Sequence, residues 1–138
     1  MRPDALLTLL KLRRRTVEEA RTALADALRR QDGAETGLLA AEEAIRTETD
    51  RAADPAAGDG VVEMFAAWLP GARRRAADAQ DCLDLAVAEA AEARAMLALA
   101  RAALEAAETL QNQAREAADM AAFRREQEIL DEAGRRSR

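Results

Sequence analysis

Hydrophobic residues recur at seven-residue steps through the first third of this chain, with one polar residue, Gln31, among them. The series steps by seven without a slip and comprises Leu10, Val17, Leu24, Gln31, Leu38 and Ile45. Three residues after most of these positions, a line of small side chains follows the same step: Ala20, Ala27, Ala34 and Ala41. A seven-residue repeat held over several turns keeps one face of a helix against a partner helix. The pattern therefore predicts a long helix that pairs with another helix.

The second half of the chain carries a matching pattern. An unbroken line of alanines comprises Ala72, Ala79, Ala86, Ala93, Ala100, Ala107, Ala114 and Ala121. Its companion series comprises Leu69, Ala76, Leu83, Ala90, Leu97, Leu104 and Gln111. Small side chains that face larger ones let two helices approach closely. We expect an antiparallel register with these facing pairs: Leu10 with Ala107, Val17 with Ala100, Leu24 with Ala93, Leu38 with Ala79 and Ile45 with Ala72.

The helix boundaries follow from proline and glycine. We predict one helix over about 3–54, a loop over 55–60 and a second, longer helix over about 61–133, all within a single domain of residues 1–138. Pro55 cannot continue the first helix, and Gly134 suits a C-terminal cap. Pro70 predicts a kink in the second helix, or a separate short helix over 61–69. The fold class is all-α, an antiparallel coiled-coil hairpin, which we expect to be monomeric.

Composition argues against several classes of function. The net charge of −5 disfavours a nucleic-acid binder, which needs a basic face. We expect no direct membrane insertion, because no apolar run reaches the length of about 18 residues that a spanning helix needs, and we see no secretory signal. Cys82 is the only cysteine, so no intramolecular disulfide is possible and a cytoplasmic location is expected.

Residues that carry out catalysis are scarce. The chain contains no histidine, so the commonest general base and metal ligand is missing. Carboxylate pairs such as Glu42 and Glu43 are expected on exposed helices, where they are solvated and no pocket surrounds them. We therefore predict that the protein is not an enzyme and that it uses no cofactor and no metal.

Two regions carry more large apolar residues than a helical pair can bury. Leucines crowd residues 6–12, and Met120, Phe123 and Leu130 lie beyond the end of the predicted pairing. The proposed contacts at this end are Leu6, Leu9, Met120, Phe123 and Leu130. At the loop end, Phe65, Trp68 and Leu69 form the one aromatic-rich cluster. These three residues either seal the core of the hairpin tip or form a docking site, because Trp is enriched in binding hot spots.

At these residues the chain resembles the FliJ family of bacterial type III export machines and its injectisome relatives of the YscO kind. The resemblance covers nearly the whole chain. It rests on leucine and basic residues over 9–15, on Phe65-x-x-Trp68-Leu69, and on Glu126-Gln127-x-x-Leu130-Asp131-Glu132. Trp68 stands where the family would have Tyr, and Pro70 is unexpected in a helix that such proteins keep long.

The resemblance implies a flagellar export component, a cytoplasmic protein peripheral to the inner-membrane export apparatus. It implies that the paired termini enter the central pore of a hexameric export ATPase, that another part of the hairpin contacts the export gate, and that the protein escorts export chaperones. The alternative is a purely structural or oligomerising coiled-coil adaptor unrelated to export, for example a parallel dimer.

Overall fold

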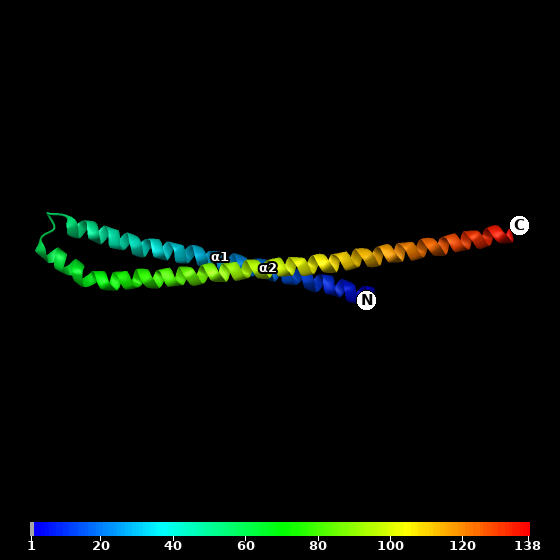
Figure 1. Ribbon diagram of the computed structural model, residues 1–138, viewed down its shortest axis with the longest axis horizontal. Coiled ribbons are helices and arrows are strands. Elements are labelled where there is room, and N and C mark those ends of the chain that lie inside the picture. Colours follow the sequence, from blue (N-terminus) through cyan, green and yellow to red (C-terminus); the bar gives the residue numbers. More distant parts are fainter. Residues whose placement is uncertain (1) are drawn as a thin grey trace. The chain divides into compact units, whose positions relative to one another are not determined.

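The chain forms two long α-helices joined by a short turn (Figure 1). The computed structural model describes residues 2–138, and within this range it contains no β-strand. Helix α1 spans Pro3–Ala53, and helix α2 spans Asp59–Arg136. The expected all-α fold of two helices, the second of them longer, is therefore confirmed. Supercoiling of the helices and a kink at Pro70 stay predictions.

The turn between the helices is held by Asp54. Its side-chain Oδ1 accepts a hydrogen bond from the backbone N–H of Ala56 at 3.0 Å, and its carbonyl oxygen accepts one from the N–H of Ala57 at 3.1 Å. Gly58 then adopts a φ of 83°, which a residue with a Cβ rarely tolerates. Asp59 opens α2, where a carboxylate is favoured by the positive end of the helix dipole.

The far end of α2 lies beyond the expected boundary. The sequence places the end of this helix at about residue 133 with Gly134 as its cap, whereas α2 continues through Gly134 to Arg136. Gly134 does not take the positive φ that a glycine cap requires. An ion pair of 3.0 Å between Arg136 and Glu132 supports this last turn, and two arginines suit the negative end of the dipole.

Pro70 lies inside α2. The alternative of a separate short helix over 61–69 is therefore wrong, because α2 runs without interruption from Asp59. Proline removes one backbone hydrogen bond from a helix interior. The helix persists because the residues beside Pro70 pack against other side chains: Ala72 is buried and Leu69 is half-buried.

The chain divides into two compact units. The terminal unit consists of residues 2–19 and Ala98–Arg138, and the turn unit consists of Ala20–Leu97. Each unit is an antiparallel pair made of one segment of α1 and one segment of α2 (Figure 1). The turn unit also contains the connection between the helices.

The core of each unit lies along the residues that the heptads select. In the terminal unit the buried apolar residues are Leu6, Leu10, Val17, Ala100 and Ala107. In the turn unit they are Ala27, Ala72, Ala86, Ala90 and Leu97. Every residue of the Leu10-to-Ile45 series and of the Ala20-to-Ala41 series is buried or half-buried. The predicted inward face of α1 is therefore confirmed.

The line of alanines in α2 is covered over less of its length than the sequence suggests. Within this line, the six alanines from Ala72 to Ala107 are buried or half-buried, whereas Ala114 and Ala121 are exposed. The physical reason is that α1 begins at Pro3. Ala114 only lines an open groove beside Pro3 and Leu6, and Ala121 lies one heptad farther along α2. The individual facing pairs of the predicted register stay predictions.

Candidate functional site

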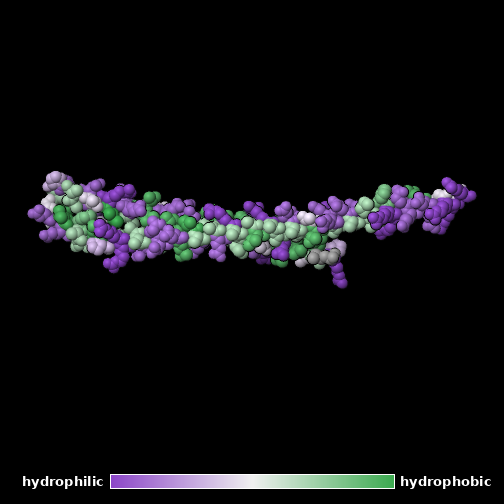
Figure 2. Space-filling model, in the orientation of Figure 1, coloured by the Kyte–Doolittle hydropathy of each residue, from purple (hydrophilic) through white to green (hydrophobic). Residues whose placement is uncertain are grey.

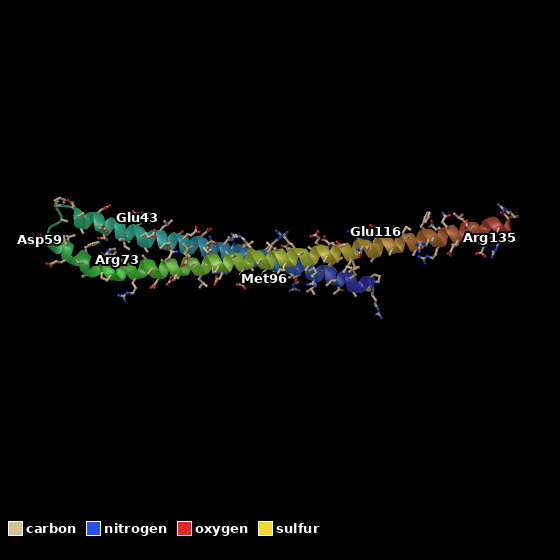
Figure 3. All side chains as sticks on the ribbon, viewed as in Figure 1. Glu43, Asp59, Arg73, Met96, Glu116 and Arg135 are labelled. Atoms are coloured by element: carbon tan, nitrogen blue, oxygen red, sulfur yellow. The ribbon has the colours of Figure 1, made fainter. Side chains whose placement is uncertain are left out.

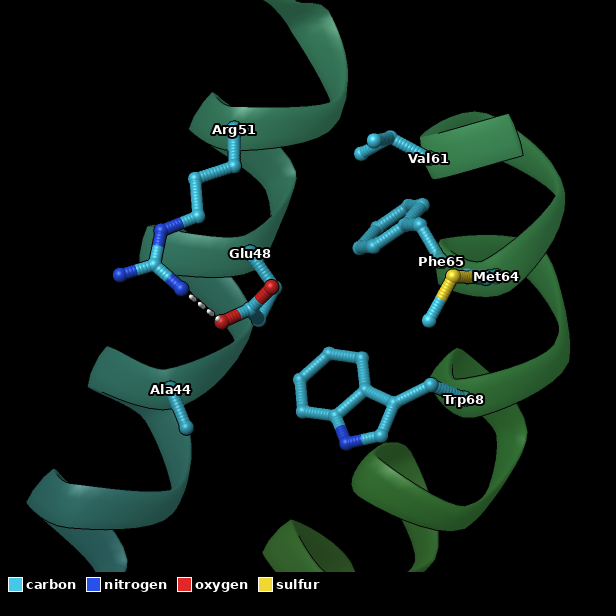
Figure 4. A pocket seen from close by; sticks show the side chains of 7 residues that line it. All are labelled: Ala44, Glu48, Arg51, Val61, Met64, Phe65 and Trp68. Carbon is cyan, nitrogen blue, oxygen red and sulfur yellow. Dashed lines mark hydrogen bonds and ion pairs between the residues drawn. The ribbon is translucent and has the colours of Figure 1, made fainter. Parts of the chain in front are cut away.

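The first candidate surface is a groove at the turn end of the turn unit. It has a volume of about 520 Å³ and is lined by Ala44, Glu48 and Arg51 of α1 and by Val61, Met64, Phe65 and Trp68 of α2. Figure 4 shows Phe65 and Trp68 pointing from α2 toward α1, with the carboxylate of Glu48 facing them. The ring centroids of Phe65 and Trp68 are 6.1 Å apart. The two aromatic residues thus make a nearly continuous apolar wall.

Polar groups stand at the edge of this groove. The Arg51 Nη1 lies 2.9 Å from Glu48 Oε1, and the guanidinium of Arg75 lies 6.0 Å from the centre of the Trp68 ring, within cation–π range. A groove with an apolar wall and a charged edge suits an apolar side chain of a helical partner.

The sequence anticipates only part of this groove. Phe65 and Trp68 do line it, and both are half-buried, whereas Leu69 is half-buried outside its lining. The residues missed are Val61 and Met64 on α2 and the three residues of α1. A signal existed for the former pair, because Val61, Met64, Phe65 and Trp68 follow the three- and four-residue spacing of one helix face. Which residues of α1 line the groove depends on the register between the two helices across the turn, which the spacing within α2 does not define.

The second candidate surface is the C-terminal part of α2 in the terminal unit. Every residue over 112–138 is exposed. Figure 3 shows the side chains between Glu116 and Arg135 standing free around the helix. Met120, Phe123 and Leu130 are 54%, 57% and 64% exposed, and Ile129 is also exposed. These large apolar side chains contribute nothing to the core of the chain.

The leucines near the N-terminus separate into two groups. Leu6 and Leu10 are buried, with exposed fractions of 5% and 1%, and Leu9 is half-buried. Leu7 and Leu12 are about half exposed. The expectation that some of these leucines stay exposed is confirmed. Leu6, however, contributes to the core of the terminal unit, so Leu7 takes its place in the exposed set.

A further groove lies beside Leu7. It has a volume of about 350 Å³ and is lined by Pro3, Leu6, Leu7, Gln111, Ala114, Arg115 and Ala118. It forms where α1 begins against α2, and the side chains of α2 that line it are small or polar. The exposed leucine and this groove extend the apolar surface of the terminal unit from α2 onto α1.

Residues 2–138 contain neither a candidate metal site nor a candidate membrane-spanning segment. No cluster of three or more acidic or cysteine side chains has an arrangement suited to a metal ion. Neither helix contains a stretch of sufficient length and hydropathy to cross a bilayer. Comparisons of the chain with family models, with curated proteins and with solved structures found no match.

Proposed function

We propose that this chain is a stalk-like component of a bacterial type III export apparatus, of the flagellar kind, that acts by binding other proteins. In this proposal the terminal unit enters the central pore of a hexameric export ATPase. The observation that carries it is the exposure of Met120, Phe123 and Leu130 on a helical segment that packs against no other segment of residues 2–138. Exposed apolar clusters of this kind mark sites of protein association.

The charges of the same segment suit a pore lined by polar loops. Basic and acidic residues alternate along it: Arg124, Arg125, Glu126, Glu128, Asp131, Glu132, Arg135 and Arg136. Charges of both signs around an apolar stripe orient a partner and accelerate its encounter. Leu7, Leu9 and Leu12 add apolar contacts from α1.

The groove lined by Phe65 and Trp68 is the proposed contact for the export gate. Aromatic residues such as Trp are enriched among the residues that dominate the binding energy of protein interfaces. The apolar wall that Phe65 and Trp68 form in this groove is accessible to solvent. Export chaperones are the third partner class. The proposed location is the cytoplasm, at the periphery of the inner-membrane export apparatus.

Binding would stimulate the ATPase by favouring assembly of its ring. A ligand that binds only the assembled state stabilises that state by mass action. No residue of this chain then has to enter the ATPase active site, which agrees with the absence of histidine from the sequence.

The test uses the export ATPase of the same organism in purified form. Phe123→Asp combined with Leu130→Asp should abolish binding to the ATPase and stimulation of ATP hydrolysis. Leu39→Asp is the matched control, because Leu39 is 61% exposed and lies in the turn unit. Undiminished stimulation by the double variant would refute docking through this end.

The alternative function, a structural or oligomerising adaptor unrelated to export, makes the opposite prediction. The wild-type chain would then neither bind nor stimulate the ATPase.

A further inference from the structure

A second line of heptad-spaced residues runs along α2 in the terminal unit. We call it the outer stripe; its members are Leu99, Ala103, Ala106, Leu110, Gln113, Ala117 and Met120. The steps between them alternate between four and three residues, and none of them is charged. All but the half-buried Ala103 are exposed, with Leu99 at 66% and Leu110 at 48%. Figure 2 shows hydrophobic colour where the stripe begins, on the part of α2 that is yellow in Figure 1; toward Met120 the ribbon turns orange.

The outer stripe is distinct from the buried face of the same helix. In this unit the residues that turn toward α1 include Ala100, Leu104 and Ala107. The charged residues of α2 between Leu99 and Arg115 lie outside both sets: Arg101, Glu105, Glu108 and Arg115. A solvated helix face would carry such charges. The outer stripe instead stays uncharged over about 32 Å, at 1.5 Å per residue, and Gln113 is its one polar member.

The spacing identifies the kind of surface that covers this stripe. Alternating steps of three and four residues keep a straight seam only against another helix, whose side chains insert between those of the first. The structure also provides space beside the stripe. A groove of about 320 Å³ is lined by Leu6, Leu110, Gln113 and Ala114. A second helix that lies along the stripe would place its side chains in this groove.

The residues of the stripe complement themselves when two copies run antiparallel. One alignment sets Leu99 opposite Ala117 and Leu110 opposite Ala106, so that both leucines face an alanine, while Met120 falls opposite Met96. A two-fold axis repeats both pairs. In a parallel arrangement Leu99 would face Leu99 of the other copy, where the two large side chains would be crowded. Ala106 would face Ala106, where a gap would remain between the helices.

Charges that continue the same spacing select this alignment. Glu92 lies seven residues before Leu99, and Arg124 lies seven residues after Ala117. In the antiparallel alignment Glu92 of each copy falls opposite Arg124 of the other. A shift by one heptad would place Arg124 opposite Leu99, or Glu92 opposite Ala117. A parallel pair would place like charges against each other, which is unfavourable.

We propose that two copies of this chain associate antiparallel through the outer stripes of their α2 helices. The monomeric hairpin expected from the sequence is the alternative that the experiments below distinguish from this dimer. The inference does not rest on the export function. It does constrain that function, because Met120 belongs both to the outer stripe and to the proposed ATPase contacts. Self-association and docking in the ring are then mutually exclusive.

The first experiment measures mass. The full chain is examined by light scattering at about 100 μM, where an interface of micromolar affinity is occupied. The wild type and Leu39→Asp should approach twice the monomer mass, while Leu99→Asp with Leu110→Asp should remain monomeric with unchanged helical circular dichroism. A monomeric wild type, or a double variant that still dimerises, would overturn the proposal.

The second experiment measures orientation. In a Cys82→Ser background, a chain with Ala106→Cys is mixed with a differently tagged chain with Leu110→Cys and is oxidised. The antiparallel pair should give the mixed disulfide in preference to either homodimer, because residues 106 and 110 of opposite copies then come within the Cα separation of roughly 4.4–6.8 Å that a disulfide needs. A predominance of the two homodimers would show a parallel pair and so refute the proposal.

Discussion

The carboxylate of Glu89 on α2 lies 3.5 Å from the guanidinium of Arg30 on α1, and this ion pair joins the two helices of the turn unit. The predicted register places Arg30 opposite residue 87, so the observed contact lies within one helical turn of it. Both side chains are about half exposed. Solvent screening limits such a pair to about 0.2–1 kcal/mol. A double-mutant cycle with Arg30→Ala and Glu89→Ala should give a coupling free energy within that range. A coupling of several kcal/mol would contradict this description of a screened pair.

The register is tested more directly in the terminal unit, where Val17 and Ala100 are both buried. If they face each other, Val17→Cys with Ala100→Cys in a Cys82→Ser background should form a disulfide within one chain. Electrophoresis without reductant, on a dilute sample, would detect the faster-migrating species. Val17→Cys with Ala107→Cys is the control, since it displaces the pair by one heptad. Faster cross-linking of the control would show that the predicted facing pairs are wrong.

Heptad spacing predicted the inward face of α1 because the repeat depends only on residue type and position. Other features depend on where the helices begin and end relative to each other. The exposure of Ala114 and the burial of Leu6 both follow from the start of α1 at Pro3. The residues of α1 in the Trp68 groove depend in the same way on the register across the turn. The outer stripe is not evident from the sequence because alanine occupies both faces of α2, which masks a second repeat.

Gly33 and Gly37 lie in the interior of α1, and a Cβ on either would meet no atom within 4 Å. Packing therefore does not require glycine at these positions. Alanine loses less backbone entropy on folding, so Gly33→Ala with Gly37→Ala should raise the stability by up to about 1 kcal/mol for each site. Gly58→Ala is the contrasting control, since its φ of 83° disfavours alanine, and it should lower the stability. Thermal unfolding followed by circular dichroism measures both, and an unchanged or lower Tm for the double variant would contradict the argument.

Gln31 occupies a position of the inward face of α1 that leucine, valine or isoleucine fills elsewhere in the series. Its Nε2 donates a hydrogen bond of 3.1 Å to Glu35, but its Oε1 is buried without a hydrogen-bond partner. A buried acceptor without a partner costs about 1–3 kcal/mol. Gln31→Leu should therefore raise the free energy of unfolding by an amount of this order. Chemical denaturation tests this, and a destabilised variant would indicate that Gln31 has a partner in solution.

Substitution of Trp68 tests whether this residue docks a partner or only stabilises the core. Its ring is half-buried and lines an open groove. Truncation of a fully buried Trp costs about 3–5 kcal/mol, so Trp68→Ala should cost less than this and should keep the helicity. If the groove binds the export gate, the same variant should bind its purified cytoplasmic domain more weakly. A stability loss in the full core range would favour a purely structural role for the ring.

Removal of residues 113–138 tests whether the C-terminal part of α2 serves binding and not folding. Every residue over 112–138 is exposed, so a chain that ends at Asn112 keeps all the buried residues of both units. The shortened chain should stay helical and lose only a few degrees of Tm, because the removed residues are exposed and only a few of them, such as Ala114 and Arg115, line the groove beside Leu6. It should no longer stimulate the export ATPase, since Phe123 and Leu130 are gone. It should also lose the antiparallel dimer, because Ala117 no longer faces Leu99 of the other copy.

Phe123→Asp with Leu130→Asp should remove only the stimulation, and Leu99→Asp with Leu110→Asp should remove only the dimer. If both pairs of substitutions instead abolished both properties, the two surfaces would be one, and the outer stripe itself would be the ATPase contact.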